Sequence, residues 1–123
     1  MRILNNLHLF ITEIAQLVIS PVFLLLTVVG NSFIGICSFI FYLLEKDINP
    51  KMHHFIDALW WGFATSTTTG YGDITPVTVG GKILGMFMML TGLAFFSIFT
   101  ALFADSFLSS KIHKSKKNER REH

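Results

Sequence analysis

The feature that most constrains this chain is the distribution of its charged residues. Residues 14–44 and 83–104 contain no Asp, Glu, Lys or Arg, which gives uncharged stretches of 31 and 22 residues. A helix needs about 20 predominantly apolar residues to cross a bilayer, so each stretch is long enough to span one. A third uncharged stretch, 58–72, has 15 residues and is too short. The pattern therefore predicts an all-α membrane protein with two transmembrane helices.

Composition excludes the main alternatives to a membrane protein. Of the 123 residues, 51% are hydrophobic and 15% are charged, against roughly 25% charged residues in soluble domains. Disordered chains have low hydrophobicity and high net charge, and this chain has neither. Its single cysteine, Cys37, cannot form an intramolecular disulfide. The chain is long enough for one modest domain.

The periodicity divides the chain into five segments. Residues 1–20 carry apolar side chains at helical spacing and predict an amphipathic helix in the membrane interface; the frayed start of the first span fits equally well. The first span is predicted at 21–44 and the second at 80–108. Between them, 57–67 predicts a short helix with Asp57 as its N-cap. Residues 109–123 form a basic tail.

A glycine-containing loop follows the short helix, which is too short to cross a membrane. Gly70 and Gly72 alternate with other residues in the run 68–73, TTGYGD. Glycine adopts positive φ readily, and alternating left- and right-handed conformations would turn successive carbonyl oxygens to one side. Non-helical backbone at membrane depth is tolerated only inside protein or beside water. Four copies around an axis would form stacked oxygen rings that can replace the hydration shell of a cation.

Residues 60–73, WWGFATSTTTGYGD, resemble the pore helix and selectivity filter of potassium channels. The order of span, re-entrant loop and span is similar to that of the bacterial two-transmembrane members, over roughly 21–108. The resemblance implies a pore domain at 21–108 with its filter at 68–72, assembled with three further copies into a homotetramer around a central pore. It also implies passive K+ conduction, no enzymatic activity and no organic cofactor.

The resemblance assigns roles around the filter. It implies that Trp60 and Trp61 support the filter and that Asp73 accepts a hydrogen bond from Trp61. The hydroxyl of Thr68 would complete the innermost ion site, and Gly72 would end the filter. The implied K+ ligands are the backbone oxygens of Thr68, Thr69, Gly70 and Tyr71.

The resemblance also assigns roles on the second span. Gly92 matches a hinge glycine, although close helix packing explains a glycine there equally well. Phe103 would gate the inner mouth by dewetting if it lined the pore. Phe96, Phe99, Phe103 and Phe107 share a face with Gly92, so periodicity does not decide which of them line it. The implied cavity and gate residues are Thr67, Gly92, Leu93, Phe96, Thr100, Phe103 and Ala104.

Thr69, Ala64 and Thr75 depart from the family pattern, Thr75 by replacing the outer-mouth aromatic residue of some members. Thr69 stands where the family usually has Val or Ile, and Ala64 stands where some members have a carboxylate. A buried hydroxyl needs a hydrogen-bond partner, for which Thr65 or a neighbouring strand is available. Thr69 therefore motivates an alternative function, a weakly selective or non-selective monovalent cation channel. A non-conducting membrane adaptor subunit is a further alternative, and it would show no ion flux.

Lysine and arginine counts predict the orientation. The tail carries six and the N-terminus one, Arg2, whereas the connection between the spans carries three. The positive-inside rule then places both termini in the cytoplasm, with the chain in the cell (inner or plasma) membrane. We expect the basic tail to contact anionic lipid headgroups rather than nucleic acid, because it has no interleaved aromatic residues.

Overall fold

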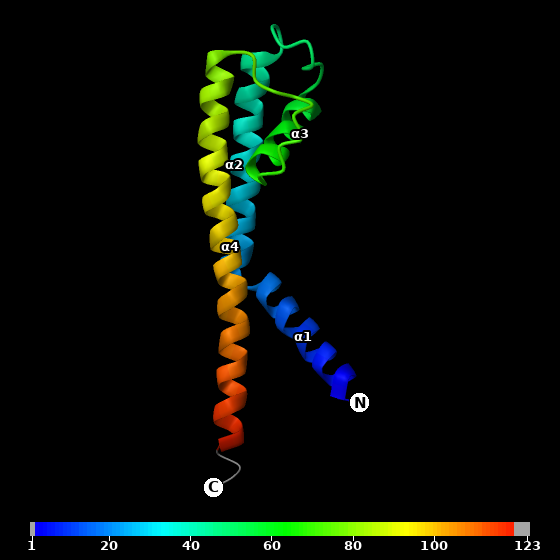
Figure 1. Ribbon diagram of the computed structural model, residues 1–123, viewed down its shortest axis with the longest axis vertical. Helices are drawn as coiled ribbons and strands as arrows, with labels where there is room; N and C mark the ends of the chain where they lie inside the picture. Colours follow the sequence, from blue (N-terminus) through cyan, green and yellow to red (C-terminus); the bar gives the residue numbers. More distant parts are fainter. Residues whose placement is uncertain (1, 120–123) are drawn as a thin grey trace. The chain divides into compact units, whose positions relative to one another are not determined.

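The computed structural model is all-helical over the residues it describes, 2–119 (Figure 1). Side chains are described for residues 7, 8, 10–12, 14–105 and 108. The chain forms two compact units: the filter unit, residues 27–97, and the terminal unit, which combines the residues up to 26 with those from 98 onward. The helices are α1 (Arg2–Ile19), α2 (Pro21–Glu45), α3 (Phe55–Ser66) and α4 (Val79–Glu119).

Among the described residues, α2 and α4 are the two helices that are long and apolar enough to cross a membrane. The 25 residues of α2 extend about 37 Å at about 1.5 Å each, which exceeds the ~30 Å of bilayer hydrocarbon. Its start is well defined, because Pro21 needs no N–H in the first turn and Ser20 Oγ accepts a hydrogen bond from Phe23 N at 3.3 Å. Ser20 is a bend that separates α1 from α2.

Helix α4 continues beyond the predicted second span. It has 41 residues and ends at Glu119, so most of the predicted tail is helical. Residues 93–119 contain neither Gly nor Pro, and Lys, Arg and Glu are good helix formers. The apolar part, Val79–Asp105, agrees with the predicted span to within a few residues.

In the filter unit, α2 and α4 lie side by side and α3 packs against them (Figure 1). Phe33 of α2 contacts Phe87 of α4 edge-on, with ring centroids 5.8 Å apart. Phe41 of α2 stacks on Trp61 of α3, with centroids 3.5 Å apart and planes at 9°. Phe41 and Met88 have no exposed surface. The buried core therefore forms where the short helix meets both long helices.

Helix α3 begins at Phe55, two residues before the prediction, and Asp57 is not its N-cap. The N-cap is His54, and Asp57 is the third helical residue. Asp57 Oδ2 instead accepts hydrogen bonds from the backbone N–H groups of His53 and His54, at 2.9 and 2.8 Å. A carboxylate one turn inside a helix can reach back to amides that have no intrahelical acceptor, which is why the helix starts earlier.

Candidate functional site

The loop after α3 has an alternating backbone. Thr68, Gly70 and Gly72 have φ of 61°, 54° and 77°. This alternation confirms the sequence-based expectation for the loop. Positive φ costs glycine little but is a genuine outlier for a β-branched residue such as Thr68, so the surrounding structure must stabilise it.

Backbone hydrogen bonds link this loop to the end of α3. Thr68 N donates to Thr65 O at 3.2 Å, and Gly70 N donates to Ala64 O at 2.9 Å. The last carbonyls of a helix lack intrahelical partners, and here the loop supplies two. In a trans peptide the C=O points opposite to the N–H, so the carbonyls of Thr67 and Thr69 point away from α3. The geometry thus directs these carbonyl oxygens to the side of the loop opposite α3.

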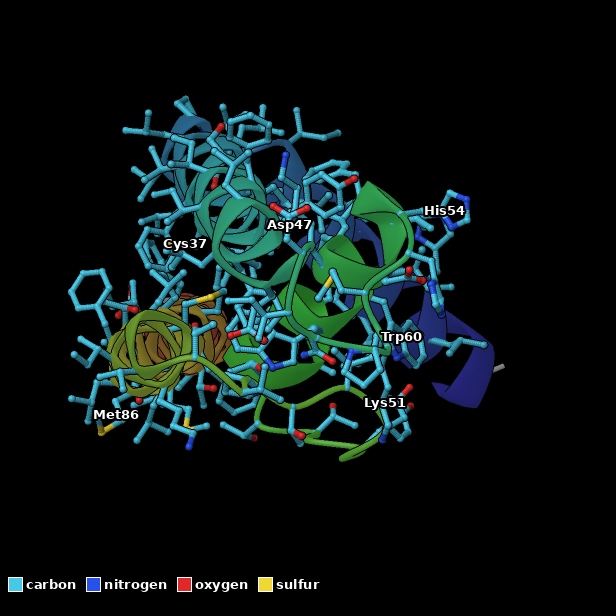
Figure 2. The ribbon with its side chains drawn as sticks, turned by 90° about the horizontal axis from the view of Figure 1, so that it is seen from above. Cys37, Asp47, Lys51, His54, Trp60 and Met86 are labelled. Carbon is cyan, nitrogen blue, oxygen red and sulfur yellow. The ribbon has the colours of Figure 1, made fainter. Side chains whose placement is uncertain are left out.

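Trp60, not Trp61, is the partner of Asp73. Trp60 Nε1 donates to Asp73 Oδ2 at 2.8 Å, and the Trp60 ring stacks on Tyr71 with centroids 5.1 Å apart. Trp60 projects from α3 away from α2 and α4 (Figure 2). Consecutive helical residues point about 100° apart, so only one tryptophan can face the loop. Trp61 faces α2, where it stacks on Phe41. The expected Trp61–Asp73 pair is therefore wrong.

The hydrogen bond from Trp60 is the main reason that the pKa of the Asp73 carboxyl lies below its ordinary value. Partial desolvation opposes this effect, whereas the backbone N–H of Ile74 and the charge of Lys51 add to it. Ile74 N donates to Asp73 Oδ1 at 3.0 Å. Asp73 is thus ionised at neutral pH and links the residues after the loop to α3.

The hydroxyl of Thr69 is bonded to Thr67 rather than to Thr65, one of its two expected partners; the other, a neighbouring strand, stays a prediction. The two hydroxyl oxygens lie 2.9 Å apart. Thr67 Oγ1 also lies 2.7 Å from Phe63 O, to which it donates. Thr65 is buried within the filter unit, whereas Thr67 and Thr69 are exposed in the single chain. A chain of side-chain hydrogen bonds therefore runs along the loop to the last turn of α3.

A second network, centred on Glu45, has no counterpart in the sequence analysis. The Glu45 side chain is fully buried at the end of α2. Its oxygens accept hydrogen bonds from Thr78 N at 2.9 Å, Thr78 Oγ1 at 2.6 Å, Val77 N at 3.0 Å and Asn49 Nδ2 at 2.8 Å. Asn49 Nδ2 also donates to Thr75 O at 2.9 Å. The network joins α2 to the segment between the loop and α4.

Sequence carried only a weak signal for this network. Asn49 follows Glu45 by one helical turn, which allows a local contact. The donors at Val77 and Thr78, however, are 32 and 33 residues away, and their backbone groups have no sequence signature. A Cβ on Gly81 would collide with Glu45 Oε1, so a glycine there lets α4 begin close to the carboxylate.

Gly92 lies at a close approach between α4 and α3. A Cβ at Gly92 would lie 2.7 Å from Ser66 Cα and 2.9 Å from Ser66 C, well inside any real contact distance. The geometry thus supports the close-packing interpretation of Gly92. Helix α4 continues unbroken through this residue, and the hinge role stays a prediction.

The two predicted faces of α4 differ in exposure, and Phe96, which belongs to both, is exposed. Leu93, Phe96, Thr100 and Ala104 are exposed in the single chain. In the terminal unit, Phe99 and Phe103 contact Phe23 of α2 edge-on, with centroids 5.3 and 6.0 Å apart. Phe103 therefore packs against a helix of its own chain, which argues against its expected role as an inner-mouth gate. The side chain of Phe107 lies outside the described residues.

The donors gathered around the loop do not resemble a resident metal centre. Within the part of the chain that is described, no three His, Cys, Asp or Glu side chains form a group that could hold a metal ion. The oxygens of residues 68–72 are backbone carbonyls and the hydroxyls of threonine and tyrosine. Neutral oxygens of this kind suit weak, exchangeable binding of a monovalent cation better than permanent coordination.

Known proteins share these features. A curated relative, potassium voltage-gated channel subfamily KQT member 4 of Homo sapiens, is 40% identical over 86 residues, 68% of this chain and 12% of that protein. A voltage-gated potassium channel of Aeropyrum pernix is 45% identical over 58 residues, 46% of this chain and 20% of that protein. The chain thus spans a small part of the curated relatives it matches, and these relatives extend beyond bacterial two-transmembrane channels.

Structural comparison agrees. The crystal structure of a voltage-gated K+ channel pore module in a closed state in lipid membranes matches with a TM-score of 0.57 and 38% identity, over 67% of this chain and 90% of that one. A sequence model of the family described as "Ion channel" matches residues 22–109. The chain therefore belongs to this ion-channel family, and its two long apolar helices and short re-entrant helix have the architecture of a potassium-channel pore module.

Proposed function

We propose that four copies of this chain form a pore that conducts K+ passively across a membrane. The observation that carries the proposal is the alternating backbone of Thr68, Gly70 and Gly72 immediately after a helix of 12 residues. Four such loops around an axis supply rings of carbonyl oxygens that can replace the hydration shell of K+. One chain cannot enclose an axis, and cyclic symmetry is the simplest closure.

The electrostatics of α3 support cation entry. Its C-terminus, at Ser66, immediately precedes the loop. The C-terminal end of a helix carries a partial negative charge, which favours a cation beside it. The implied ion sites use the backbone oxygens of Thr68, Thr69, Gly70 and Tyr71. The implied cavity residues, Leu93, Phe96, Thr100 and Ala104, are exposed in the single chain.

The apolar surface of the single chain requires cover. Val79, Leu90 and Phe96 are 74%, 72% and 66% exposed, and Met86 projects from α4 away from α2 and α3 (Figure 2). Large apolar side chains this exposed are covered by lipid or by other subunits in a stable protein. We infer that the other copies cover part of it and lipid the rest. The positive-inside rule places both termini in the cytoplasm, where the basic tail contacts anionic headgroups.

A second candidate function is a weakly selective monovalent cation channel. Thr69 favours it, because a hydroxyl in the filter adds a polar group that Val or Ile would lack. The intact Gly70-Tyr71-Gly72 run favours K+ selectivity, and we adopt the selective pore as the conclusion.

Ion flux from the purified chain in liposomes tests the function. We expect a reversal potential near that of K+ when K+ and Na+ gradients are opposed, with block by barium. Gly70→Ala should abolish the flux, because its φ of 54° strains any other residue. Gly35→Ala is the matched control, since a Cβ there meets no atom within 4 Å. Equal Na+ and K+ currents would favour the weakly selective channel, and a stable tetramer without flux would favour the adaptor.

A further inference from the structure

We propose that Thr69 is a positioning residue of the filter, and that its hydroxyl, bonded to Thr67, stabilises the K+-selective backbone conformation. The inference deepens the proposed function and rests on it. The hydroxyl pair lies on the side of the loop that faces α3, whereas the carbonyl oxygens of Thr67 and Thr69 point to the opposite side. Its evidence is the pair of hydroxyl oxygens 2.9 Å apart and the contact of Thr67 with Phe63 O.

The direction of these hydrogen bonds follows from counting protons. A hydroxyl has one proton, and a carbonyl oxygen can only accept. The 2.7 Å contact with Phe63 O therefore uses the proton of Thr67. Thr69 must then be the donor in the bond between the two hydroxyls. The result is a continuous path from Thr69 through Thr67 to the backbone of α3.

The path spans the most strained residue of the loop. Thr67 and Thr69 flank Thr68, the non-glycine residue with positive φ in the described chain. Thr68 N and Gly70 N already bond to α3 through the backbone, and the hydroxyl pair adds a connection between the two side chains that flank Thr68. A hydrogen bond between residues i−1 and i+1 restricts the conformation of residue i. The pair therefore favours the left-handed conformation of Thr68, on which the carbonyl directions depend.

This arrangement reverses the expected meaning of Thr69. A hydroxyl that donates to Thr67 behind the loop is not directed at the ions, so it does not weaken selectivity by binding Na+. Its removal should instead loosen the filter. Rigid spacing of oxygen ligands is one source of discrimination between K+ and Na+.

The test compares variants that differ in one hydroxyl. Thr69→Val keeps the shape and removes the donor, and we expect the K+/Na+ permeability ratio to fall about fivefold, the equilibrium equivalent of one net hydrogen bond. Thr69→Ser, which keeps the hydroxyl, should recover most of the ratio. Thr91→Val is the matched control, because Thr91 Oγ1 also donates to a carbonyl four residues back, Phe87 O, at 2.6 Å. It should leave the ratio unchanged.

A double-mutant cycle identifies the partner. Thr67→Val removes the acceptor of the Thr69 proton together with the bond to Phe63 O. If the pair acts as a unit, Thr67→Val/Thr69→Val is no worse than Thr67→Val alone, whereas independent effects would multiply. A second readout is the rise in the thermal midpoint of the assembled protein on replacing Na+ with K+, which we expect to be smaller in Thr69→Val.

Each outcome decides the proposal. A Thr69→Val ratio equal to or above that of the wild type overturns it, as does a Thr69→Ser variant that behaves like Thr69→Val. Failure of Thr69→Val to assemble while Thr69→Ser assembles supports it, because serine keeps the hydroxyl whereas valine keeps only the branched shape. If the wild type carries no K+ current, the proposed function fails separately, and the thermal comparison between K+ and Na+ still tests the hydroxyl pair.

Discussion

The filter unit and the terminal unit are stabilised by different kinds of interaction. In the filter unit, directional hydrogen bonds hold non-helical backbone: Trp60 to Asp73, Thr67 to Phe63, and four donors to Glu45. In the terminal unit, the packing of α2 on α4 is described by the edge contacts of Phe23 with Phe99 and Phe103. The first unit contains the loop that we propose binds ions, and the second contains regular helix.

The difference reflects what each part must specify. A spanning helix satisfies its own backbone groups, so it needs length and apolar side chains, and its packing tolerates many apolar substitutions. A loop with positive φ at three positions has no internal pattern of hydrogen bonds and adopts one conformation only when its neighbours impose it. Polar substitutions should therefore matter most in the filter unit, and the four predictions below test that contrast.

The largest effect on stability is expected at Glu45. Glu45→Ala leaves the N–H groups of Val77 and Thr78 and the amide of Asn49 without their acceptor, at a cost of about 3 kcal/mol. Glu45→Gln keeps one acceptor oxygen and should cost less. Thermal or denaturant unfolding of the assembled protein in detergent measures both. The control is Asp47→Asn, which removes an exposed charge two residues away. An equal loss of stability in Asp47→Asn would contradict the idea that buried polar contacts stabilise the filter unit.

Replacing either of two glycines in the filter unit with alanine should lower stability, but a second substitution should restore it at only one of them. A Cβ on Gly62 would collide with Ser38 Oγ, whereas a Cβ on Gly92 would meet the backbone of Ser66. Gly62→Ala and Gly92→Ala should each cost about 2 kcal/mol by overpacking. Ser38→Ala should rescue most of the first and none of the second, because only a side chain can be trimmed.

Ser38→Ala on its own supplies the control for this comparison. Ser38 is fully buried, and its Oγ is the buried side-chain atom without a hydrogen-bond partner among the described residues. Removing an unsatisfied hydroxyl should leave stability unchanged or slightly higher. A clear loss of stability would mean that Ser38 has a partner in the assembled protein, and the rescue experiment would then need reinterpretation.

In the terminal unit we expect a smaller, purely apolar coupling. A double-mutant cycle with Phe23→Ala and Phe103→Ala should give about 1 kcal/mol of interaction, typical of an edge-to-face aromatic pair. Flux through Phe103→Ala, measured in liposomes alongside its stability, separates this role from gating. Increased basal flux with no coupling to Phe23 would restore Phe103 as the inner gate and contradict the packing role.

The smallest effect concerns Asp73. Because its pKa is lowered, Asp73 contributes stability above its ordinary pKa of 3.8, and this contribution is lost as the pH falls through the lower folded-state value. Trp60→Phe removes the main cause and should raise the pKa of Asp73, measured by NMR titration of the labelled carboxyl. Trp61→Phe should leave it unchanged. The opposite result would support the Trp61–Asp73 pair that the resemblance implies.

The sequence by itself determined which stretches form the two long helices and where glycine allows positive φ. Two long uncharged stretches decide that α2 and α4 can span a membrane, because length and apolarity are sufficient for a helix. The alternation of Gly70 and Gly72 likewise indicated positive φ before any contact was known, since it depends on each residue alone. Two helix boundaries differ from the prediction. Helix α3 starts earlier because the Asp57 carboxylate accepts hydrogen bonds from the preceding amides, and α4 ends later because its polar tail favours helix.

Only the tertiary structure decided which side chains meet. Sequence named Trp60, Trp61, Thr65 and Thr69 as candidates, but the pairs Trp60–Asp73 and Thr67–Thr69 depend on how α3 turns relative to the loop. The Glu45 network joins residues more than 30 positions apart through backbone N–H groups, which every residue type except proline carries. Consecutive side chains on a helix point about 100° apart, and periodicity does not decide which of them faces the loop. Packing decides it, because only one rotation of α3 places Trp61 on Phe41 and leaves Trp60 for Tyr71 and Asp73.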